Sequence, residues 1–254
     1  MNRIARLVVR DMWVMNRGLL VIQFVLPLFL LFVASFPLSA LIAPFSVDGL
    51  AVTYQRFIAV GLVAQTTMTG SLVGGTLLFT DRRHGMFEQI LVGPFAKSTY
   101  AASKIFSSML IGLLGAALVA LFGLPFTYGA AVTIPGAAAA LAAVVLGAVV
   151  FSGFSIILAS LFKSLEAFEG TFNLLFILLT FVSSTLYPLA SVPPALRDFM
   201  LLNPLTYVVD LTRAGMLGLS SPYVWWEGPV LAVEAAVVFA LALASIRRIS
   251  LSGT

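Results

Sequence analysis

The chain has 254 residues, of which 61% are hydrophobic and only 9% are charged, and its mean hydropathy is +1.09. A water-soluble domain carries about 25% charged residues, so this composition excludes an ordinary soluble enzyme. Cysteine is absent, which excludes disulfides and thiolate metal sites. Whatever the protein does, it does across or within a lipid bilayer.

Six apolar stretches are long enough to cross a bilayer as helices, since about 18 apolar residues or more suffice for one crossing. We predict spans at 19–43, 57–79, 104–128, 135–161, 169–189 and 228–246. Pro27 and Pro37 lie inside the first span and should kink it or end it early, because each removes a backbone donor. The predicted fold is therefore an all-α polytopic membrane protein with six transmembrane helices, forming one domain over residues 1–254.

Positive charge is distributed unevenly between the loops. Of the fourteen Lys and Arg residues, eleven lie on the side of both chain ends: Arg3, Arg6, Arg10, Arg17, Arg82, Arg83, Lys97, Lys104, Lys163, Arg247 and Arg248. The opposite side keeps Arg56, Arg197 and Arg213. Cytoplasmic loops are enriched in Lys and Arg, so both termini are predicted to be cytoplasmic in a multi-pass protein of the cell membrane. The net charge of +4 is explained by this asymmetry and by contact with anionic headgroups, rather than by nucleic-acid binding.

The segment 1–17 precedes the first span and is predicted to be an amphipathic helix. Its four arginines recur at helical spacing, while Ile4, Leu7 and Val8 lie on the other side. Such a helix lies in the cytoplasmic membrane interface, with Trp13 at the level of the headgroups. The simpler alternative is a charge cluster that only sets the topology.

The segment 81–98 joins the second and third spans on the cytoplasmic side. A short helix is expected from Gly85 to the Gly93-Pro94 pair. It would be amphipathic and could dock a soluble partner, although an ordinary charged loop remains the alternative. His84 is the only histidine of the chain, so a metal role is not expected there.

The segment 190–227 lies between the last two predicted spans, on the outer side. Pro193-Pro194 can begin one helix, and Asn203-Pro204 can end it and begin another. The two short helices are apolar, so we expect a re-entrant pair at 194–202 and 204–217 that dips into the outer leaflet and is buried against protein. Asn203 should cap the second helix, and Asp210 can pair with Arg213 one turn away. A small external cap is the alternative.

Charge is nearly absent inside the predicted spans, and Glu234 is the exception. A charge at this depth costs about 3 kcal/mol, so Glu234 should face protein or water, either as a structural group or in a substrate role. The second span carries small and polar residues, among them Thr66, Thr69, Gly70 and Gly74. This surface suits close helix packing, and it could equally line a polar pathway.

Several kinds of chemistry have no sequence signature here. The chain has no phosphate-binding G-x-x-x-x-G-K-[ST] pattern, no paired-histidine metal motif and no G-x-S-x-G nucleophile turn. A stand-alone secondary transporter or channel remains a competing interpretation, although secondary transporters usually show several ionisable residues inside the membrane. A membrane-embedded enzyme acting on lipid is a third interpretation, for which no catalytic constellation is visible.

Two motifs resemble those of a known family, the membrane-spanning permease subunits of type-2 ABC exporters. The first is the cytoplasmic run Arg82-Arg83-His84-Gly85-Met86-Phe87-Glu88, followed by Ile90-Leu91, Pro94, Lys97 and Lys104. The second is Leu196-Arg197, followed by Asn203-Pro204-Leu205-Thr206-Tyr207, Asp210 and Arg213. The chain departs from the family pattern at Arg83, where an acidic residue is common, and at Met86, where threonine is common.

The resemblance implies a transport subunit that is not itself an enzyme. Two copies would pair with two separate ATP-binding subunits, which would hold ATP and Mg, and this chain would bind no cofactor or metal of its own. The residues expected to couple to the ATPase are Arg82, Gly85, Met86, Phe87, Glu88, Ile90, Leu91 and Pro94. The residues expected to form an external gate are Asn203, Pro204, Tyr207, Asp210 and Arg213. The family exports drugs, lipids and lipid-linked glycans, so a hydrophobic or amphiphilic substrate is expected to move outward by alternating access.

Overall fold

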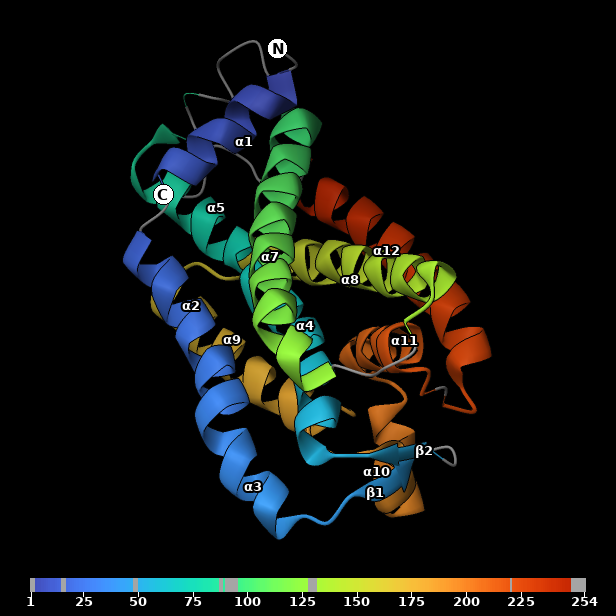
Figure 1. Cartoon of the computed structure of the whole chain (residues 1–254). Coiled ribbons are helices and arrows are strands. Elements are labelled where there is room, and N and C mark those ends of the chain that lie inside the picture. The colour runs from blue at the N-terminus through green and yellow to red at the C-terminus, as the bar shows by residue number, and fades with distance from the viewer. Residues whose placement is uncertain are drawn as a thin grey trace.

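The computed structural model describes residues 3–14, 17–47, 50–86, 89, 96–127, 132–219 and 221–247. Almost all of these residues are helical, which confirms the predicted all-α fold (Figure 1). The elements, in chain order, are α1 (Arg3–Val14), α2 (Arg17–Phe29), a π-helical turn (Leu30–Ala34), α3 (Ser35–Leu41), β1 (Phe45–Val47), β2 (Leu50–Val52), α4 (Tyr54–Ser71), α5 (Val73–Arg83), α7 (Lys97–Thr127), α8 (Ile134–Leu161), α9 (Leu165–Phe181), a 3-10 turn (Leu189–Ser191), α10 (Pro194–Met200), α11 (Pro204–Leu217) and α12 (Val224–Arg247).

Within the described ranges, five helical stretches are long and apolar enough to cross a membrane: 24–41, 54–83, 97–127, 134–161 and 224–246. They correspond to five of the six predicted spans. The predicted span 169–189 overlaps α9 only in part, because α9 begins at Leu165, has 17 residues and ends at Phe181. At 1.5 Å per residue it reaches about 25 Å, less than the hydrocarbon thickness of about 30 Å. The count of six spans therefore stays a prediction.

Two predicted spans contain local irregularities. The first one includes Pro27, and a π-helical turn begins three residues later, where the hydroxyl of Ser35 donates to the carbonyl of Leu31. Pro37 follows Val33 of this turn by four residues and has no amide hydrogen to donate to the Val33 carbonyl, which is where a proline disturbs a helix. The second span breaks at Leu72, between α4 and α5, which the uninterrupted apolar run did not predict.

The hairpin of β1 and β2 was also not predicted. Its strands pair antiparallel, with Phe45 opposite Val52 and Val47 opposite Leu50. It follows the first span directly, and Val52 packs with Phe57 and Leu219. In Figure 1 the hairpin lies beside α10 at one end of the bundle, whereas α1 lies across the first residues of α7 at the opposite end.

Residues without side chains allow α4 and α7 to approach closely. A Cβ atom on Gly70 would lie 2.6 Å from the Cα of Gly112, and one on Gly112 would lie 2.7 Å from the backbone oxygen of Thr67. Small residues favour such contacts between membrane helices. The two helices therefore form a closely packed central pair.

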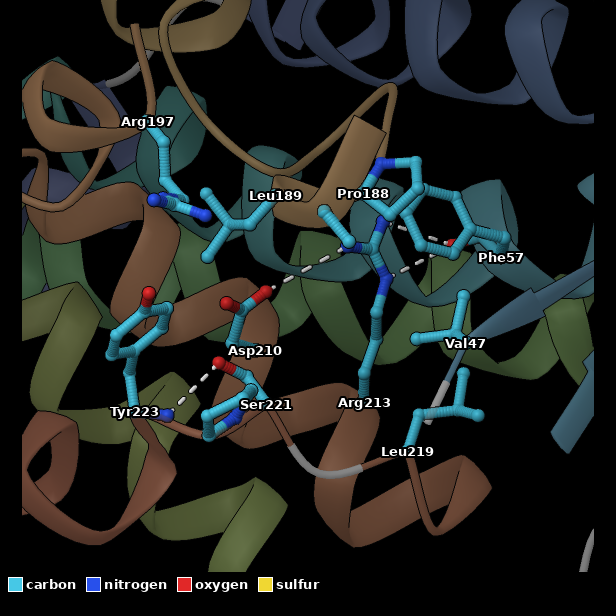
Figure 2. A pocket seen from close by; sticks show the side chains of 12 residues that line it. Val47, Phe57, Pro188, Leu189, Arg197, Asp210, Arg213, Leu219, Ser221 and Tyr223 are labelled. Atoms are coloured by element: carbon cyan, nitrogen blue, oxygen red, sulfur yellow. Dashed lines mark hydrogen bonds and ion pairs between the residues drawn. The ribbon is translucent and has the colours of Figure 1, made fainter. Parts of the chain in front are cut away.

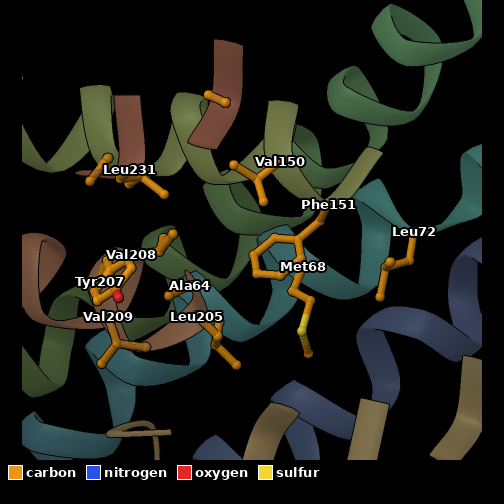
Figure 3. Packing of buried hydrophobic residues seen from close by; sticks show 12 residues of the cluster. Ala64, Met68, Leu72, Val150, Phe151, Leu205, Tyr207, Val208, Val209 and Leu231 are labelled. Carbon is orange, nitrogen blue, oxygen red and sulfur yellow. The ribbon is translucent and has the colours of Figure 1, made fainter. Parts of the chain in front are cut away.

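A large apolar cluster holds α11 against the same centre. Figure 3 shows Met68 of α4 and Phe151 of α8 packed beside Leu205 and Val208 of α11. Val208 leaves no room for a side chain at Gly147, where a Cβ would lie 2.5 Å from its Cγ2. The short helix α11 is thereby buried among α4, α8 and α12. The first helix of the predicted pair is different, because α10 exposes Leu196, Phe199 and the following Leu202. The re-entrant pair therefore stays a prediction.

Replacing Gly112 by alanine should destabilise the protein, because the added Cβ has no space beside Thr67. Overpacking of this kind costs about 1–3 kcal/mol. The matched control is Gly170→Ala on α9, where a Cβ would meet nothing within 4 Å and where alanine favours the helix by about 1 kcal/mol. Thermal unfolding in mild detergent should show a lower Tm for Gly112→Ala alone. Equal Tm values would contradict the close contact between α4 and α7.

Candidate functional site

Four charged side chains from three helices meet in a buried cluster. The guanidinium Nη2 of Arg10 lies 2.7 Å from Asp11 Oδ1 and 2.7 Å from Asp81 Oδ2. The Nζ of Lys104 lies 2.8 Å from Asp11 Oδ1 and 2.7 Å from Asp81 Oδ2. Each cation therefore contacts both carboxylates, and the four charges close into a ring. We call Arg10, Asp11, Asp81 and Lys104 the charge ring.

The charge ring is balanced in charge and almost dry. Asp11 and Lys104 are each 1% exposed. The Tyr100 hydroxyl donates to Asp81 Oδ2 at 2.9 Å, and the Ser107 hydroxyl donates to Asp11 Oδ2 at 2.8 Å. Buried ions are tolerated only when their partners and remaining hydrogen bonds are supplied. Because α1 provides two of the four charges, the ring ties α1 to α5 and α7.

Arg10 is the most exposed member of the charge ring, with 21% of its side chain accessible. Burial by itself would lower the pKa of this guanidinium. The hydrogen bonds and negative charges of Asp11 and Asp81 outweigh that effect and raise the pKa above its ordinary value. Arg10 therefore keeps its positive charge at any physiological pH.

The predicted coupling residues begin directly after the charge ring. Arg82 follows Asp81, donates to the carbonyl of Ala159 at 3.4 Å, and lies over the Phe79 ring. Gly85 has a φ of 66°, a left-handed conformation that glycine adopts readily, and Met86 is half-buried. The other predicted coupling residues lie outside the described residues: Phe87, Glu88, Ile90, Leu91 and Pro94.

The predicted gate residues lie at the other end of the bundle, on α11 and the turn before it. Asn203 Oδ1 accepts from the Leu205 amide at 2.9 Å, which is the predicted helix cap. Its amide also donates to the carbonyls of Leu179 and Val182 at 2.8 and 2.5 Å. Pro204 occupies the first helical position, and the Tyr207 hydroxyl donates to the Leu201 carbonyl. The turn is therefore fixed to the end of α9 as well as to its own helix.

Arg213 connects three parts of the chain at this end. Its guanidinium donates to the carbonyls of Phe57, Ser184 and Thr185 at 2.6–3.3 Å. It also stacks on the Phe57 ring, 3.4 Å from the centroid. The predicted pair with Asp210 is present at 3.8 Å, and the Ser184 hydroxyl donates to Asp210 at 2.6 Å. At 3% exposure, Arg213 holds α11 to α4 and to the segment after α9.

A pocket of about 130 Å³ opens beside this pair (Figure 2). Its lining comes from the hairpin, α4, the 3-10 turn with the proline before it, α10, α11 and the segment between α11 and α12: Val47, Phe57, Pro188, Leu189, Ala190, Arg197, Asp210, Arg213, Leu219, Ser221, Pro222 and Tyr223. In Figure 2 the guanidinium of Arg197 points toward the same space as the Asp210 carboxylate and the Tyr223 hydroxyl. Polar groups that converge in a small, otherwise apolar recess suit recognition of a small polar group.

The candidate pathway residues of the second span make helix contacts. The hydroxyls of Thr66 and Thr69 donate to the carbonyls of Leu62 and Gln65, each at 2.7 Å. A Cβ on Gly74 would lie 2.6 Å from the Ser108 hydroxyl, so Gly74 and Gly70 both face α7. Glu234 is half-buried on α12. A role for these residues in a pathway stays a prediction.

Sequence reasoning missed most of the charges buried inside the bundle. Asp81 and Lys104 lie within candidate spans, and Glu227 on α12 is 0% exposed, with both carboxyl oxygens lacking a hydrogen-bond partner among the described residues. Glu234 is therefore one of several charged residues that are buried or half-buried in the described helices. One signal was available: Tyr100, Lys104 and Ser107 recur at helical spacing and place polar groups on one face of α7.

The charge ring predicts a specific pattern of stabilities. Lys104→Met leaves two buried carboxylates with one cation, so it should destabilise the protein by about 3–5 kcal/mol. Adding Asp11→Asn removes one of those carboxylates and leaves Arg10 paired with Asp81, so the double variant should be more stable than Lys104→Met alone. The control is Lys163→Met at an exposed lysine. A double variant no more stable than Lys104→Met, measured by thermal unfolding, would contradict the ring.

Comparison with known proteins identifies what the chain is similar to. The family model described as ABC-2 type transporter matches residues 3–217. A putative transport permease, ycf38, of Cyanophora paradoxa is 27% identical over 67% of this chain and 59% of its own length. The ycf38 permease of Porphyra purpurea is 29% identical over 67% of this chain and 59% of its own length. Nodulation protein J of Rhizobium leguminosarum bv. viciae is 25% identical over 80% of this chain and 77% of that protein. The matched part thus spans about three fifths of the ycf38 permeases.

Proposed function

Because the chain belongs to the ABC-2 type transporter family and is a membrane permease subunit of an ABC transporter, we propose that it exports a hydrophobic or amphiphilic substrate. Energy would come from ATP and Mg bound on two copies of a separate ABC ATP-binding subunit. A second copy of this permease would complete the pathway. The candidate substrates are a drug, a lipid or a lipid-linked glycan.

The observation that carries the proposal is the charge ring. It joins α1 to the residues that flank the cytoplasmic segment 84–96, since Asp81 precedes that segment and Lys104 follows it. A partner that pushes on this segment would move the end of α5 and the start of α7 together with α1. The ring supplies the stiff connection that such a transfer of force needs, because its charges cannot separate without leaving a buried ion unpaired.

The opposite end supplies the second half of an alternating-access cycle. Segment 190–227 would act as an external gate, with Arg213 fixing α11 to α4. Since α4 continues through α5 to the charge ring, a movement of α5 reaches the gate through one almost continuous span. Opening and closing of the two ends would then alternate as ATP is bound and hydrolysed.

Exposed apolar side chains suit the proposed assembly in lipid. Phe29, Phe32, Val33 and Phe36 along the first span are each more than 40% exposed. Such a surface is stable only when lipid or another apolar surface covers it. A second copy of the chain and the membrane lipid would share this surface.

The proposed orientation can be tested with single cysteines, since the native chain has none. His84→Cys and Ser164→Cys should react with a membrane-impermeant maleimide only in inside-out vesicles of the cell membrane. Ser46→Cys and Ser191→Cys, exposed at the hairpin end, should react only in intact cells. Labelling of Ser46→Cys from the cytoplasmic side would contradict the topology.

The coupling role can be tested with the charge-neutral double variant Asp11→Asn/Lys104→Met. Purification from native membranes in mild detergent should recover an ABC ATP-binding subunit in equal amount with wild type and with this variant. ATP hydrolysis should continue in the variant. ATP-dependent export of a fluorescent phospholipid analogue from vesicles should fall by about tenfold or more, because α1, α5 and α7 are joined by fewer ion pairs and their movements are less strongly coupled. Lys163→Met is the matched control.

Two results would count against the proposal. Export by wild type in proteoliposomes without ATP and without any partner would favour a stand-alone transporter. Unchanged export by the double variant would show that the charge ring supports folding alone.

A further inference from the structure

The pocket beside Asp210 has an excess of one positive charge. Its twelve lining residues include three charged side chains, Arg197, Arg213 and Asp210. Arg213 is already committed to the carbonyls of Phe57, Ser184 and Thr185 and to its pair with Asp210. Its charge is thereby compensated locally, and it has little capacity left for a ligand.

Arg197 is in a different situation. Its Nε–H is buried and has no hydrogen-bond acceptor among the described residues, although a buried donor without a partner costs free energy. The side chain extends from α10 toward the pocket, where Asp210 and Tyr223 face it (Figure 2). A guanidinium presents several donors in one plane, which matches the oxygens of a phosphate group. Arg197 therefore offers an unfilled anion contact inside the recess.

The size of the recess limits what can fill it. About 130 Å³ is less than the roughly 300–1,000 Å³ of a pocket that takes a drug-sized molecule, so only a small group fits. The apolar part of the lining, Val47, Leu189 and Leu219 among it, suits the carbon atoms attached to that group. These features match a phosphate ester better than a bulky drug or a free sugar chain.

We propose that this pocket binds the phosphate ester of an amphiphile, with Arg197 as the residue that contacts its oxygens. Asp210 sets the charge that is accepted, because the pocket tolerates one net negative charge and repels a second. The inference rests on the proposed function, since it names the substrate group that the external gate would hold on the way out. Binding itself does not depend on ATP.

The test measures binding to the complete permease complex in mild detergent without ATP. The probes are dihexanoyl phosphatidylglycerol, inorganic phosphate and the uncharged dihexanoyl glycerol. Wild type should bind the phosphatidylglycerol. Arg197→Ala should raise the Kd for phosphatidylglycerol by about tenfold or more, which is the effect of losing a charged hydrogen bond. Arg197→Lys should keep part of the affinity. Arg56→Ala, which removes another cation of the same end outside the pocket, should change nothing.

Asp210→Asn gives a second readout, which a purely structural residue would not produce. Removing its negative charge should tighten binding of the phosphatidylglycerol. It should also allow the doubly charged form of inorganic phosphate, which predominates above neutral pH, to bind better. Competition by inorganic phosphate in wild type would assign the site to the phosphate group alone, and its absence would assign the site to a lipid headgroup.

Two outcomes would overturn the inference. One is equal affinity of wild type and Arg197→Ala for phosphatidylglycerol, when both have the same thermal unfolding curve. The other is equal binding of the uncharged glycerol lipid. Either result would leave ATP-dependent export and its dependence on the charge ring untouched, so failure of this site is separable from failure of the proposed function.

Discussion

The arrangement of the described helices depends on four charges that cannot leave one another. Asp11, Asp81, Arg10 and Lys104 are held in a nearly dry site, where each ion is stable only because two opposite charges contact it. The apolar side of α1 alone would allow that helix to slide along the membrane surface. Leu7 packs with Leu78 and Tyr100 and so buries part of the apolar side of α1. The charge ring fixes the position of α1 relative to α5 and α7.

A second buried cation solves the same problem differently at the other end. Arg213 is compensated mainly by backbone carbonyls and by the face of Phe57, and only weakly by Asp210 at 3.8 Å. Gly61 is needed beside it, because a Cβ there would lie 2.6 Å from the Thr185 oxygen and 2.8 Å from Nη2. Backbone carbonyls cannot change rotamer as side chains do, so the contact between Arg213 and its neighbours is rigid. Any movement at this end of the bundle must therefore displace whole helices or loops.

The sequence was sufficient to predict those features that depend on residues close together in the chain. The helix at 135–161 was predicted almost to the residue, because its apolar run is uninterrupted. In the structure Thr133 caps this helix and Pro135 stands in its first turn. The cap at Asn203 and the pair of Asp210 with Arg213 are likewise contacts between near neighbours. The charge ring was missed because Asp11, Asp81 and Lys104 are distant in sequence. Lys104 alone resembles a topogenic charge, and neither aspartate indicates a partner by itself. The break at Leu72 was missed because nothing in an apolar run indicates it.

The charge ring and Arg213 lie at opposite ends of one span, which consists of α4 and α5. This span contains both the close packing against α7 and the break at Leu72. Gly70 and Gly112 hold α4 against α7, and Leu72 separates that tight region from α5, which carries Asp81 to the charge ring. The break is bridged by Ser155 of α8, whose hydroxyl donates to the Leu72 carbonyl and accepts from the Gly75 amide. A backbone joint that is supported by a neighbouring side chain can change its angle without exposing unsatisfied polar groups to lipid. In the proposed transport cycle, movement of α5 would be passed to α4, and through Arg213 to α11, as a change of angle at this joint.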